Sequence, residues 1–286
     1  MNSQVLTLPD GRQLGYLIAG RGAPVMYFHG TASSRLEALL LKPLLNKNIQ
    51  LISVDRPGYG LSTYKPRKTI QDFNSDFNFL VNHLGLSQFS VLGWSGGGVF
   101  ALAYITCFSQ RIKRGVIVGT PDLPFDASTA HNMPLAKYVL KIPLLGALAM
   151  KSMRRQVLKA DGYPSFMRSN QGRQMLNGGS TRDALFFSNP EWMGLMHLSM
   201  AEAFRQKEGV QAVLDEHKLF LNPWNLSFRE VNGMLWVWHG QEDKTCPVNN
   251  AYSIARKFKG TDLEIFPQQG HCVMFDNIDQ LSRLLI

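Results

Sequence analysis

The pentapeptide Gly93-Trp94-Ser95-Gly96-Gly97 places a serine between glycines where the chain changes character. The apolar run 89–92 before it is typical of a buried strand, and the run 99–108 after it is typical of a buried helix. A strand, a tight turn and a helix in this order predict a nucleophile elbow, in which glycines let strand and helix approach closely. We therefore expect the Ser95 hydroxyl to project from the turn as a nucleophile.

A serine hydroxyl is a weak nucleophile at neutral pH, so it needs a general base and a carboxylate that orients the base. His271 follows the last predicted strand and is the candidate base. Asp243 follows an earlier strand and is the candidate acid, with Glu242 and Asp122 as rivals. The carboxyl ends of parallel strands share one edge of a sheet, so these side chains can converge although they are far apart in the sequence.

The other histidines suit other roles. His29 and His239 end predicted strands beside glycines, where bracing a loop suits them at least as well as catalysis. The remaining four fall either on surface positions or in a region without predicted strands: His83, His217, His131 and His197.

Acyl transfer through a serine also needs amide donors for the oxyanion. The turn itself positions the backbone amide of Gly96. The second amide is expected from the loop 30–34 after the third strand, where Thr31 is the best candidate. These two amides complete the predicted catalytic group.

Eight apolar runs predict the strands of one sheet, and helical patterns lie between most of them. The first two runs flank Pro9-Asp10-Gly11 and predict an antiparallel hairpin. The strands are expected at 4–8, 13–19, 24–30, 49–54, 89–92, 115–119, 234–240 and 263–266. Helices are expected at 36–45, 69–84, 99–108, 248–258 and 273–285. This alternation predicts an α/β fold with a mostly parallel sheet covered by helices.

From 122 to 226 the strand pattern is absent, and helix-like pieces are interrupted by Pro and Gly. A segment of this length is too long for a loop, so we expect a helical cap, or lid, inserted into a core domain made of 1–121 and 227–286. Most of the twelve methionines fall in it. Their flexible thioethers suit an adaptable apolar wall. The candidate substrate-binding residues are Trp94, Met133, Phe166, Phe187 and Trp192.

The composition predicts a protein that needs no metal and no disulfides. At 286 residues the chain can bury a large core, and its three cysteines are too few for a disulfide framework. The first residues do not read as an export signal, and no apolar run is long enough to span a membrane, so we expect a cytoplasmic protein. The net charge of +9 comes without a nucleic-acid-binding motif, so we expect no nucleic-acid partner. No cofactor motif is present, and the sequence does not reveal the oligomeric state.

The segment 137–159 is basic and lacks acidic residues: Lys137, Lys141, Lys151, Arg154, Arg155 and Lys159. A basic amphipathic segment of this kind can lie on a membrane surface. Pro143 and Gly146 interrupt the pattern, which favours a broken pair of lid helices instead.

The motifs together resemble the α/β-hydrolase fold superfamily, in particular serine hydrolases of the esterase type with a helical cap. The resemblance rests on the order Ser95, Asp243, His271, on the elbow, and on the segments His29-Gly30, 55–60 and 239–243. It implies an eight-stranded sheet. Haloalkane dehalogenases and epoxide hydrolases of this fold carry an aspartate where Ser95 stands, and proline iminopeptidases usually carry Trp-Gly after the serine, where this chain has Gly96-Gly97.

The resemblance implies a serine hydrolase, and we interpret the chain as a carboxylesterase for small or medium apolar esters that works through an acyl-enzyme. The alternatives within the same fold are a peptidase, a thioesterase and a carbon-carbon hydrolase. A ligand receptor with negligible turnover remains a further alternative, because the fold alone does not determine the reaction.

Overall fold

The computed structural model describes residues 2–126, 142–169, 180–228 and 234–286. Its centre is one eight-stranded sheet with the strand order β1-β2-β4-β3-β5-β6-β7-β8. The first two pairings, β1 with β2 and β2 with β4, are antiparallel, and all later pairings are parallel. The strands are β1 (Asn2–Thr7), β2 (Gln13–Gly20), β3 (Ala23–Phe28), β4 (Ile49–Val54), β5 (Phe89–Trp94), β6 (Ile112–Val118), β7 (Leu235–Gly240) and β8 (Asp262–Phe266). The predicted fold class is confirmed.

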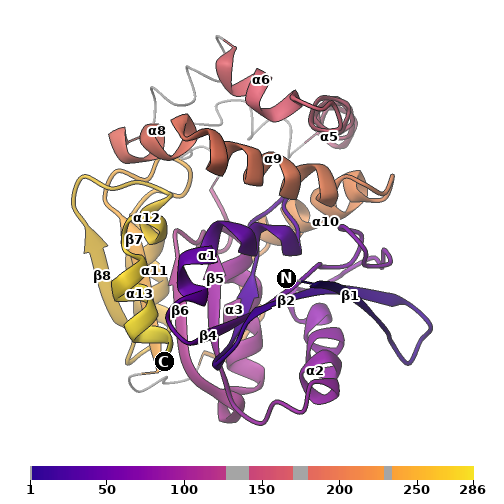
Figure 1. Ribbon diagram of the computed structural model, residues 1–286. Helices are drawn as coiled ribbons and strands as arrows, with labels where there is room; N and C mark the ends of the chain where they lie inside the picture. The colour runs from indigo at the N-terminus through magenta and orange to yellow at the C-terminus, as the bar shows by residue number, and fades with distance from the viewer. Residues whose placement is uncertain (1, 127–141, 170–179, 229–233) are drawn as a thin grey trace.

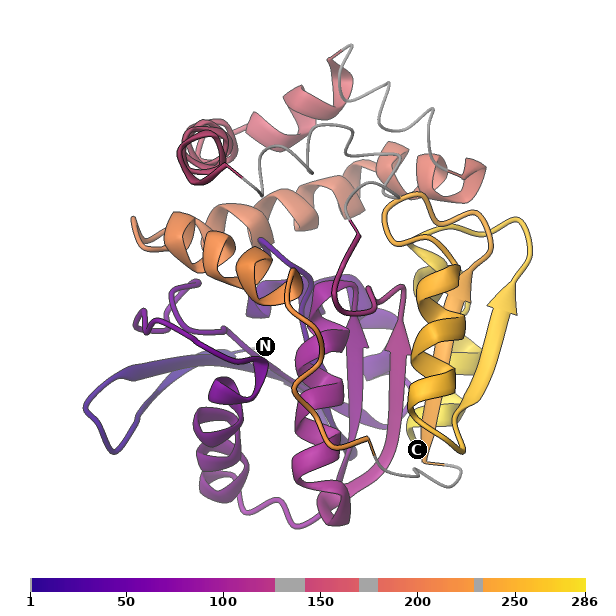
Figure 2. The ribbon, with the colours of Figure 1, turned by 180° about the vertical axis from the view of Figure 1, so that it is seen from behind.

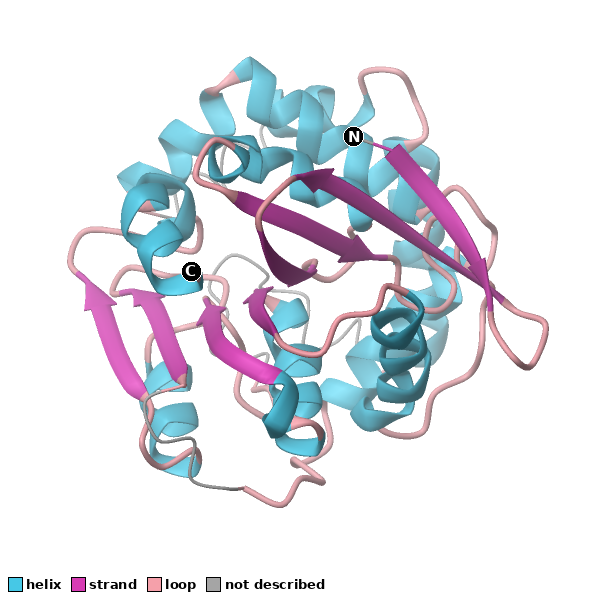
Figure 3. Cartoon of the chain, turned by 60° about the horizontal axis from the view of Figure 1, so that its bottom comes forward, coloured by secondary structure: helices cyan, strands magenta, loops and turns pink. Residues whose placement is uncertain are grey.

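Helices cover both faces of this sheet, which is strongly twisted (Figure 3). One face packs against α2 (Asn74–His83), α3 (Gly96–Cys107) and α11 (Asn249–Lys257), as seen in Figure 2. The other packs against η1 (Arg35–Leu41), α1 (Lys42–Leu45), α12 (Val273–Asp276) and α13 (Ile278–Leu285). The strands between these layers are buried on both sides, and β5 is buried along its whole length.

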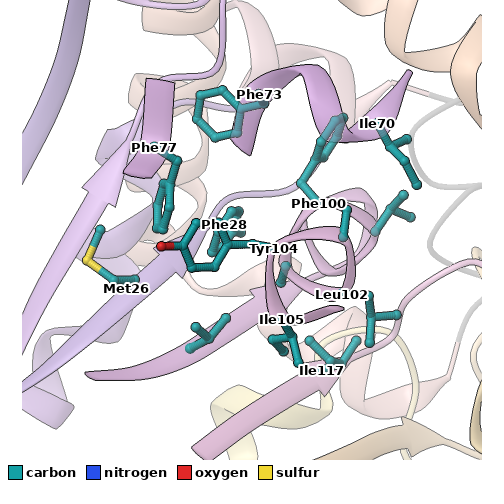
Figure 4. Packing of buried hydrophobic residues seen from close by; sticks show 14 of the residues in the cluster. Met26, Phe28, Ile70, Phe73, Phe77, Phe100, Leu102, Tyr104, Ile105 and Ile117 are labelled. Atoms are coloured by element: carbon teal, nitrogen blue, oxygen red, sulfur yellow. The ribbon is translucent and has the colours of Figure 1, made fainter. Parts of the chain in front are cut away.

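Aromatic packing fixes α3 beneath the elbow. Phe77 contacts both the ring of Phe28 and the ring of Tyr104, with a centroid distance of 4.6 Å to each (Figure 4). Phe28 ends β3 and Tyr104 lies on α3, so this cluster joins the strand before the oxyanion loop to the helix after Ser95.

Two expected helices are each divided. The pattern at 69–84 forms a 3-10 turn, η2 (Ile70–Phe73), followed by α2, and Thr69 and Asp72 form a capping box at its start. The pattern at 273–285 forms α12 and α13, which are separated at Asn277. The Asn277 side-chain amide donates to the carbonyl of Val273 at 2.7 Å, an alternative to continuing the helix.

Between β6 and β7 the described residues form helices and no strand, as expected. They are α5 (Pro143–Val157), α6 (Gly162–Arg168), α8 (Thr181–Ser188), α9 (Pro190–Ala203) and α10 (Gly209–Phe220), which we call the helical layer. The helical layer lies across one end of the sheet (Figure 1). The boundaries at 122 and 226 stay a prediction.

The predicted break within 137–159 is wrong at Gly146. Helix α5 continues through this glycine, at a cost of roughly 1 kcal/mol relative to alanine. Pro143 starts the helix at its first turn, where the missing N–H costs no hydrogen bond. Lys137 and Lys141 lie outside the described residues. None of the helices described is both long enough and apolar enough to cross a membrane.

Candidate active site

Ser95 occupies a sharp turn between β5 and α3. Its backbone has φ 54° and ψ −132°, a left-handed conformation that costs a non-glycine residue about 1–3 kcal/mol. The crossing of strand and helix is so close that a Cβ on Gly93 would lie 2.7 Å from Gly98 Cα, and a Cβ on Gly97 would overlap the carbonyl of Phe28. The glycines therefore permit the turn that the sequence predicts.

His271 and Asp243 form a buried pair at the carboxyl end of the sheet. The Nδ1 atom of His271 lies 2.7 Å from Asp243 Oδ2, and the two residues are 9% and 3% exposed. The other carboxylate oxygen accepts the amides of Thr245 and Cys246, each at 2.8 Å. A carboxylate can only accept a hydrogen bond, so this contact places a proton on Nδ1 and leaves Nε2 unprotonated in the neutral ring.

His271 and Asp243 each stabilise the charged form of the other. Burial by itself would lower the pKa of His271, but the nearby Asp243 carboxylate outweighs this effect, and the pKa lies above its ordinary value of 6.5. Burial by itself would raise the pKa of Asp243, but His271 and His239 hold it below its ordinary value. Asp243 is therefore ionised when His271 accepts a proton.

His239 holds Asp243 from the other side. Its Nε2 lies 2.6 Å from the carbonyl of Cys246 and 3.3 Å from Asp243 Oδ2. The role of a loop brace, expected from its position at a strand end, therefore fits His239, and the brace acts on the candidate acid.

Gly119 brings the elbow and the histidine together. The amide of Ser95 donates to the carbonyl of Val118 at 2.9 Å, and a Cβ on the next residue, Gly119, would lie 3.1 Å from His271 Nδ1. The indole of Trp94 donates to the His271 carbonyl at 3.0 Å. The hydrogen bonds among the described residues do not include one from Ser95 Oγ to His271, and such contacts often tighten only when substrate binds.

The candidate oxyanion loop lies directly beside the elbow. A Cβ on Gly30 would be 3.6 Å from Ser95 Cβ, and a Cβ on Gly96 would overlap Thr31 Oγ1. The loop is held from below by the buried Glu37, whose Oε1 accepts the Gly30 amide at 2.7 Å. Burial raises the pKa of this carboxyl. Gly96 and Thr31 therefore lie in neighbouring segments, and the role of their amides as oxyanion donors stays a prediction.

A buried ion cluster lies behind this loop, and no sequence pattern predicted it. The Arg56 guanidinium donates to the carbonyls of His29 and Gly30, at 2.6 and 3.0 Å. It also pairs with Glu216 of α10, which in addition accepts from Arg67 at 3.0 Å. The two arginines outweigh the effect of burial and lower the pKa of Glu216 to about 2. The turn-rich segment 55–60 marked the position of Arg56, but nothing in the sequence marked its partner on α10.

Asp183 of α8 was also missed. Its carboxylate accepts the backbone amides of His271 and Cys272, at 2.9 and 2.8 Å, and it is 5% exposed. Its own amide donates to Ser180 Oγ, so the residue lies in the first turn of a capped helix. An aspartate three residues after a serine is an ordinary helix start, and no sequence pattern relates it to the loop 88 residues further on.

The five candidate substrate-binding residues have different positions. Trp94 is 4% exposed and contacts His271 and Phe275. Phe187 and Trp192 are partly buried and pack on Phe186 in the helical layer. Met133 and the side chain of Phe166 lie outside the described residues. The contact with substrate stays a prediction for all five.

The rival residues have other partners. Asp122 pairs with Lys257 at 2.6 Å and accepts a hydrogen bond from the Trp224 indole, so its carboxylate forms a salt bridge away from His271. His29 is buried, and its Nδ1 lies 2.9 Å from the Gly30 carbonyl. His217 is partly buried, and its Nδ1 lies 2.8 Å from the Val213 carbonyl. His131 lies outside the described residues.

The described residues contain no group of three or more His, Cys, Asp or Glu side chains that could hold a metal ion. Cys246 and Cys272 are buried free thiols, and burial raises the pKa of each well above its ordinary value. Ser95, His271 and Asp243 are the side chains at the sheet edge whose types and positions suit nucleophilic chemistry.

Comparison with known proteins agrees with the fold described above. Residues 23–142 match the profile of a family described as having the alpha/beta hydrolase fold. Over 99% of this chain and 96% of the other, the structure resembles a thermophilic esterase from Thermogutta terrifontis, with a TM-score of 0.65 and 21% identity. A meta-cleavage product hydrolase (CumD) from Pseudomonas fluorescens covers 98% of this chain and 95% of its own, with a TM-score of 0.67 and 18% identity.

Sequence relatives are distant. Serine hydrolase-like protein 2 from Homo sapiens is 26% identical over 57% of this chain and 55% of its own length. A 2-hydroxy-6-oxo-2,4-heptadienoate hydrolase from Pseudomonas putida is 21% identical over 98% of this chain and 94% of its own length. The match spans about half of the human relative and 37% of an uncharacterised hydrolase from Bacillus subtilis.

Proposed function

We propose that this chain, which has the α/β-hydrolase fold, is a serine hydrolase that cleaves carboxylic esters through an acyl-enzyme. The observation that carries the proposal is the buried hydrogen bond from His271 Nδ1 to Asp243, formed at the same sheet edge as the strained turn at Ser95. A hydroxyl in this position needs only a base and an oxyanion site to attack a carbonyl.

In the proposed mechanism, His271 Nε2 takes the proton of Ser95 Oγ while the oxygen attacks the ester carbonyl. The negative charge moves to the carbonyl oxygen, which the amides of Gly96 and Thr31 receive. His271 then protonates the leaving alkoxide, and the acyl group remains on Ser95. Water enters, gives a proton to His271 and attacks the acyl carbon, which releases the acid and restores the hydroxyl.

Asp243 stabilises the imidazolium that forms in each half of the reaction. Because the pKa of His271 lies above 6.5, the rate should rise with pH through that pKa as the base loses its proton. Small and medium apolar acyl groups fit the proposal, because the part of the helical layer near His271 is aromatic: Phe186 and Trp192 pack on Phe275, and Phe187 packs on Phe186.

The test uses p-nitrophenyl esters of graded chain length. We expect turnover by the wild-type protein and a loss of about 10⁴-fold or more in Ser95→Ala. Ser87→Ala is the matched control, because Ser87 is exposed in the loop before β5. Wild-type rates in Ser95→Ala would overturn the proposal.

A second candidate reaction is the hydrolysis of a carbon-carbon bond. The observation that favours it is the near full-length match to the 2-hydroxy-6-oxo-2,4-heptadienoate hydrolase. Competition between a dienoate of that class and the preferred ester separates the two. A kcat/KM higher for the dienoate supports the second candidate, and no turnover of the dienoate removes it. A thioester and an amide in the same series test the thioesterase and peptidase alternatives.

A second candidate setting is an anionic lipid surface. Helix α5 exposes Leu144 at 71% and Leu148 at 56%, and further along the same face it exposes Lys151 and Arg155. Apolar side chains followed by basic ones suit a headgroup region. Co-sedimentation with phosphatidylserine vesicles at low salt, weakened by Leu144→Ser, would support this setting, and no binding would remove it.

A further inference from the structure

Both backbone groups of His271, its carbonyl and its amide, form hydrogen bonds to other parts of the molecule. The His271 carbonyl accepts the Trp94 indole at 3.0 Å, and Trp94 belongs to the elbow. The His271 amide donates to Asp183 Oδ2 at 2.9 Å, and Asp183 belongs to α8 of the helical layer. The backbone of the candidate base is therefore held between the sheet and the helical layer.

The loop approaches Asp183 too closely for a side chain at the preceding position. A Cβ on Gly270 would overlap Asp183 Oδ2 and Ser180 Oγ. The second carboxylate oxygen accepts the Cys272 amide at 2.8 Å, so both oxygens bind consecutive amides of the loop. A carboxylate buried to this degree costs free energy unless it is hydrogen-bonded, and these amides supply that compensation.

Asp183 also faces His271 electrostatically. The carboxyl groups around the imidazole are Asp243 from the loop after β7, Asp183 from α8 and Glu37 from η1. All three favour the protonated ring, and they act against burial. The buried Cys272 thiol, next in the chain, has its pKa raised by burial and by the same Asp183 charge.

We infer that Asp183 is a positioning residue: through its hydrogen bonds to the His271 and Cys272 amides, it makes the placement of the base depend on the seating of α8. With α8 in place, the loop is fixed and Nδ1 meets Asp243. When α8 moves away from the sheet, the loop loses both acceptors at once. Catalysis is thereby linked to the contact between α8 and the His271 loop. This inference rests on the proposed function, because it assigns His271 as the base.

The first test compares Asp183→Asn with Glu202→Gln. Glu202 of α9 also joins the helical layer to the core, through Arg35 at 2.8 Å, and its ion pairs within the described residues are with Arg35 and Arg205. Asparagine keeps the size of the aspartate side chain, removes its charge, and presents an N–H group to a backbone donor. We expect kcat/KM for the preferred ester to fall about 10- to 100-fold in Asp183→Asn, mainly through kcat.

The pH profile separates positioning from general destabilisation. Removal of the Asp183 charge should lower the pKa of His271, so the acid limb of kcat/KM should move to lower pH in Asp183→Asn and stay in place in Glu202→Gln. An acid limb that stays at the same pH in Asp183→Asn would overturn the inference. Equal losses of kcat/KM in both variants at equal melting temperature would also overturn it.

The second test does not depend on turnover. In proteins labelled with ¹³C-histidine and carrying Ser95→Ala, NMR titration follows the His271 ring, which His271→Gln identifies. We expect a lower His271 pKa when Asp183→Asn is added, and the same pKa overturns the inference. If the wild-type protein hydrolyses no ester, the proposed function fails while this titration still decides the contact.

Discussion

A buried carboxylate of the helical layer holds each of the two loops beside Ser95. The loop that carries His271 presents backbone N–H groups, whereas the oxyanion loop presents backbone carbonyls. The base loop presents the amides of His271 and Cys272, and Asp183 binds them directly. The oxyanion loop presents the carbonyls of His29 and Gly30, so a cation, Arg56, must lie between them and Glu216. Whether a loop presents N–H groups or carbonyls to the helical layer therefore decides which ion binds it directly.

This difference also matches the charges of the proposed reaction. Asp183 adds negative charge near the imidazole, where a positive charge forms during catalysis. Arg56 adds positive charge behind the loop whose amide is to receive the oxyanion. The two anchors are thus complementary to the charges that develop in front of them.

The largest effect on stability is expected at the buried ion cluster of Glu216, Arg56 and Arg67. Glu216→Gln leaves Arg56 and Arg67 buried without a carboxylate, and removal of one partner of a buried ion pair costs about 3–5 kcal/mol of unfolding free energy. Asp183→Asn should cost less, because its partners are neutral amides. Urea denaturation of both variants measures this, and equal losses would contradict the comparison.

The same ion cluster has a pH dependence. The pKa of Glu216 is lowered from 4.5 to about 2, so its stabilisation is complete above pH 4.5 and is lost as the pH falls toward 2. The Gln variant should lack this part of the acid transition, and the difference between the two denaturation curves should shrink below pH 4.5.

An intermediate effect is expected at Gly270. In Gly270→Ala the new methyl group would displace Asp183 from the base loop, at a cost of about 1–3 kcal/mol in stability. The kcat for the preferred ester should fall with KM little changed, because the base and not the substrate site is disturbed. Steady-state kinetics and thermal melting measure both, and wild-type kcat in this variant would show that the close packing has no catalytic role.

The smallest effect is expected at Gly194, which is the matched control. This glycine lies in the middle of α9 with nothing within 4 Å of an added Cβ. Gly194→Ala should stabilise the protein by about 0.5–1 kcal/mol and leave kcat unchanged. If it altered kcat as Gly270→Ala does, the stability of the helical layer, and not the Asp183 contact, would control the base.

The sequence predicts the parts of the molecule that local pattern determines. The run 49–54 is a strand with those bounds, and Ser95 lies in the tight turn between strand and helix that its flanking glycines predict. The meeting of Asp243 and His271 follows from parallel topology, because each comes after a strand end. These features need no knowledge of side-chain contacts between distant segments.

The two anchors escape prediction for the opposite reason. Asp183 and Glu216 lie on helices of the layer that covers the sheet, and their partners are 88 and 160 residues away in the chain. In sequence each reads as an ordinary polar residue of a helix. Helix α5 shows that a local pattern can also mislead. Gly146 suggested a break, but the helix continues through this residue. Buried polar contacts between layers depend on how the layers dock, which neither periodicity nor composition encodes.

The most direct test of the account is to trap the acyl-enzyme. The protein is mixed with a p-nitrophenyl ester, quenched in acid within one turnover, digested and analysed by mass spectrometry. The account predicts one added acyl mass on the peptide that contains Ser95, absent in Ser95→Ala and strongly reduced in His271→Gln. Turnover of the ester with the acyl mass on another residue, or the same mass in Ser95→Ala, would contradict it.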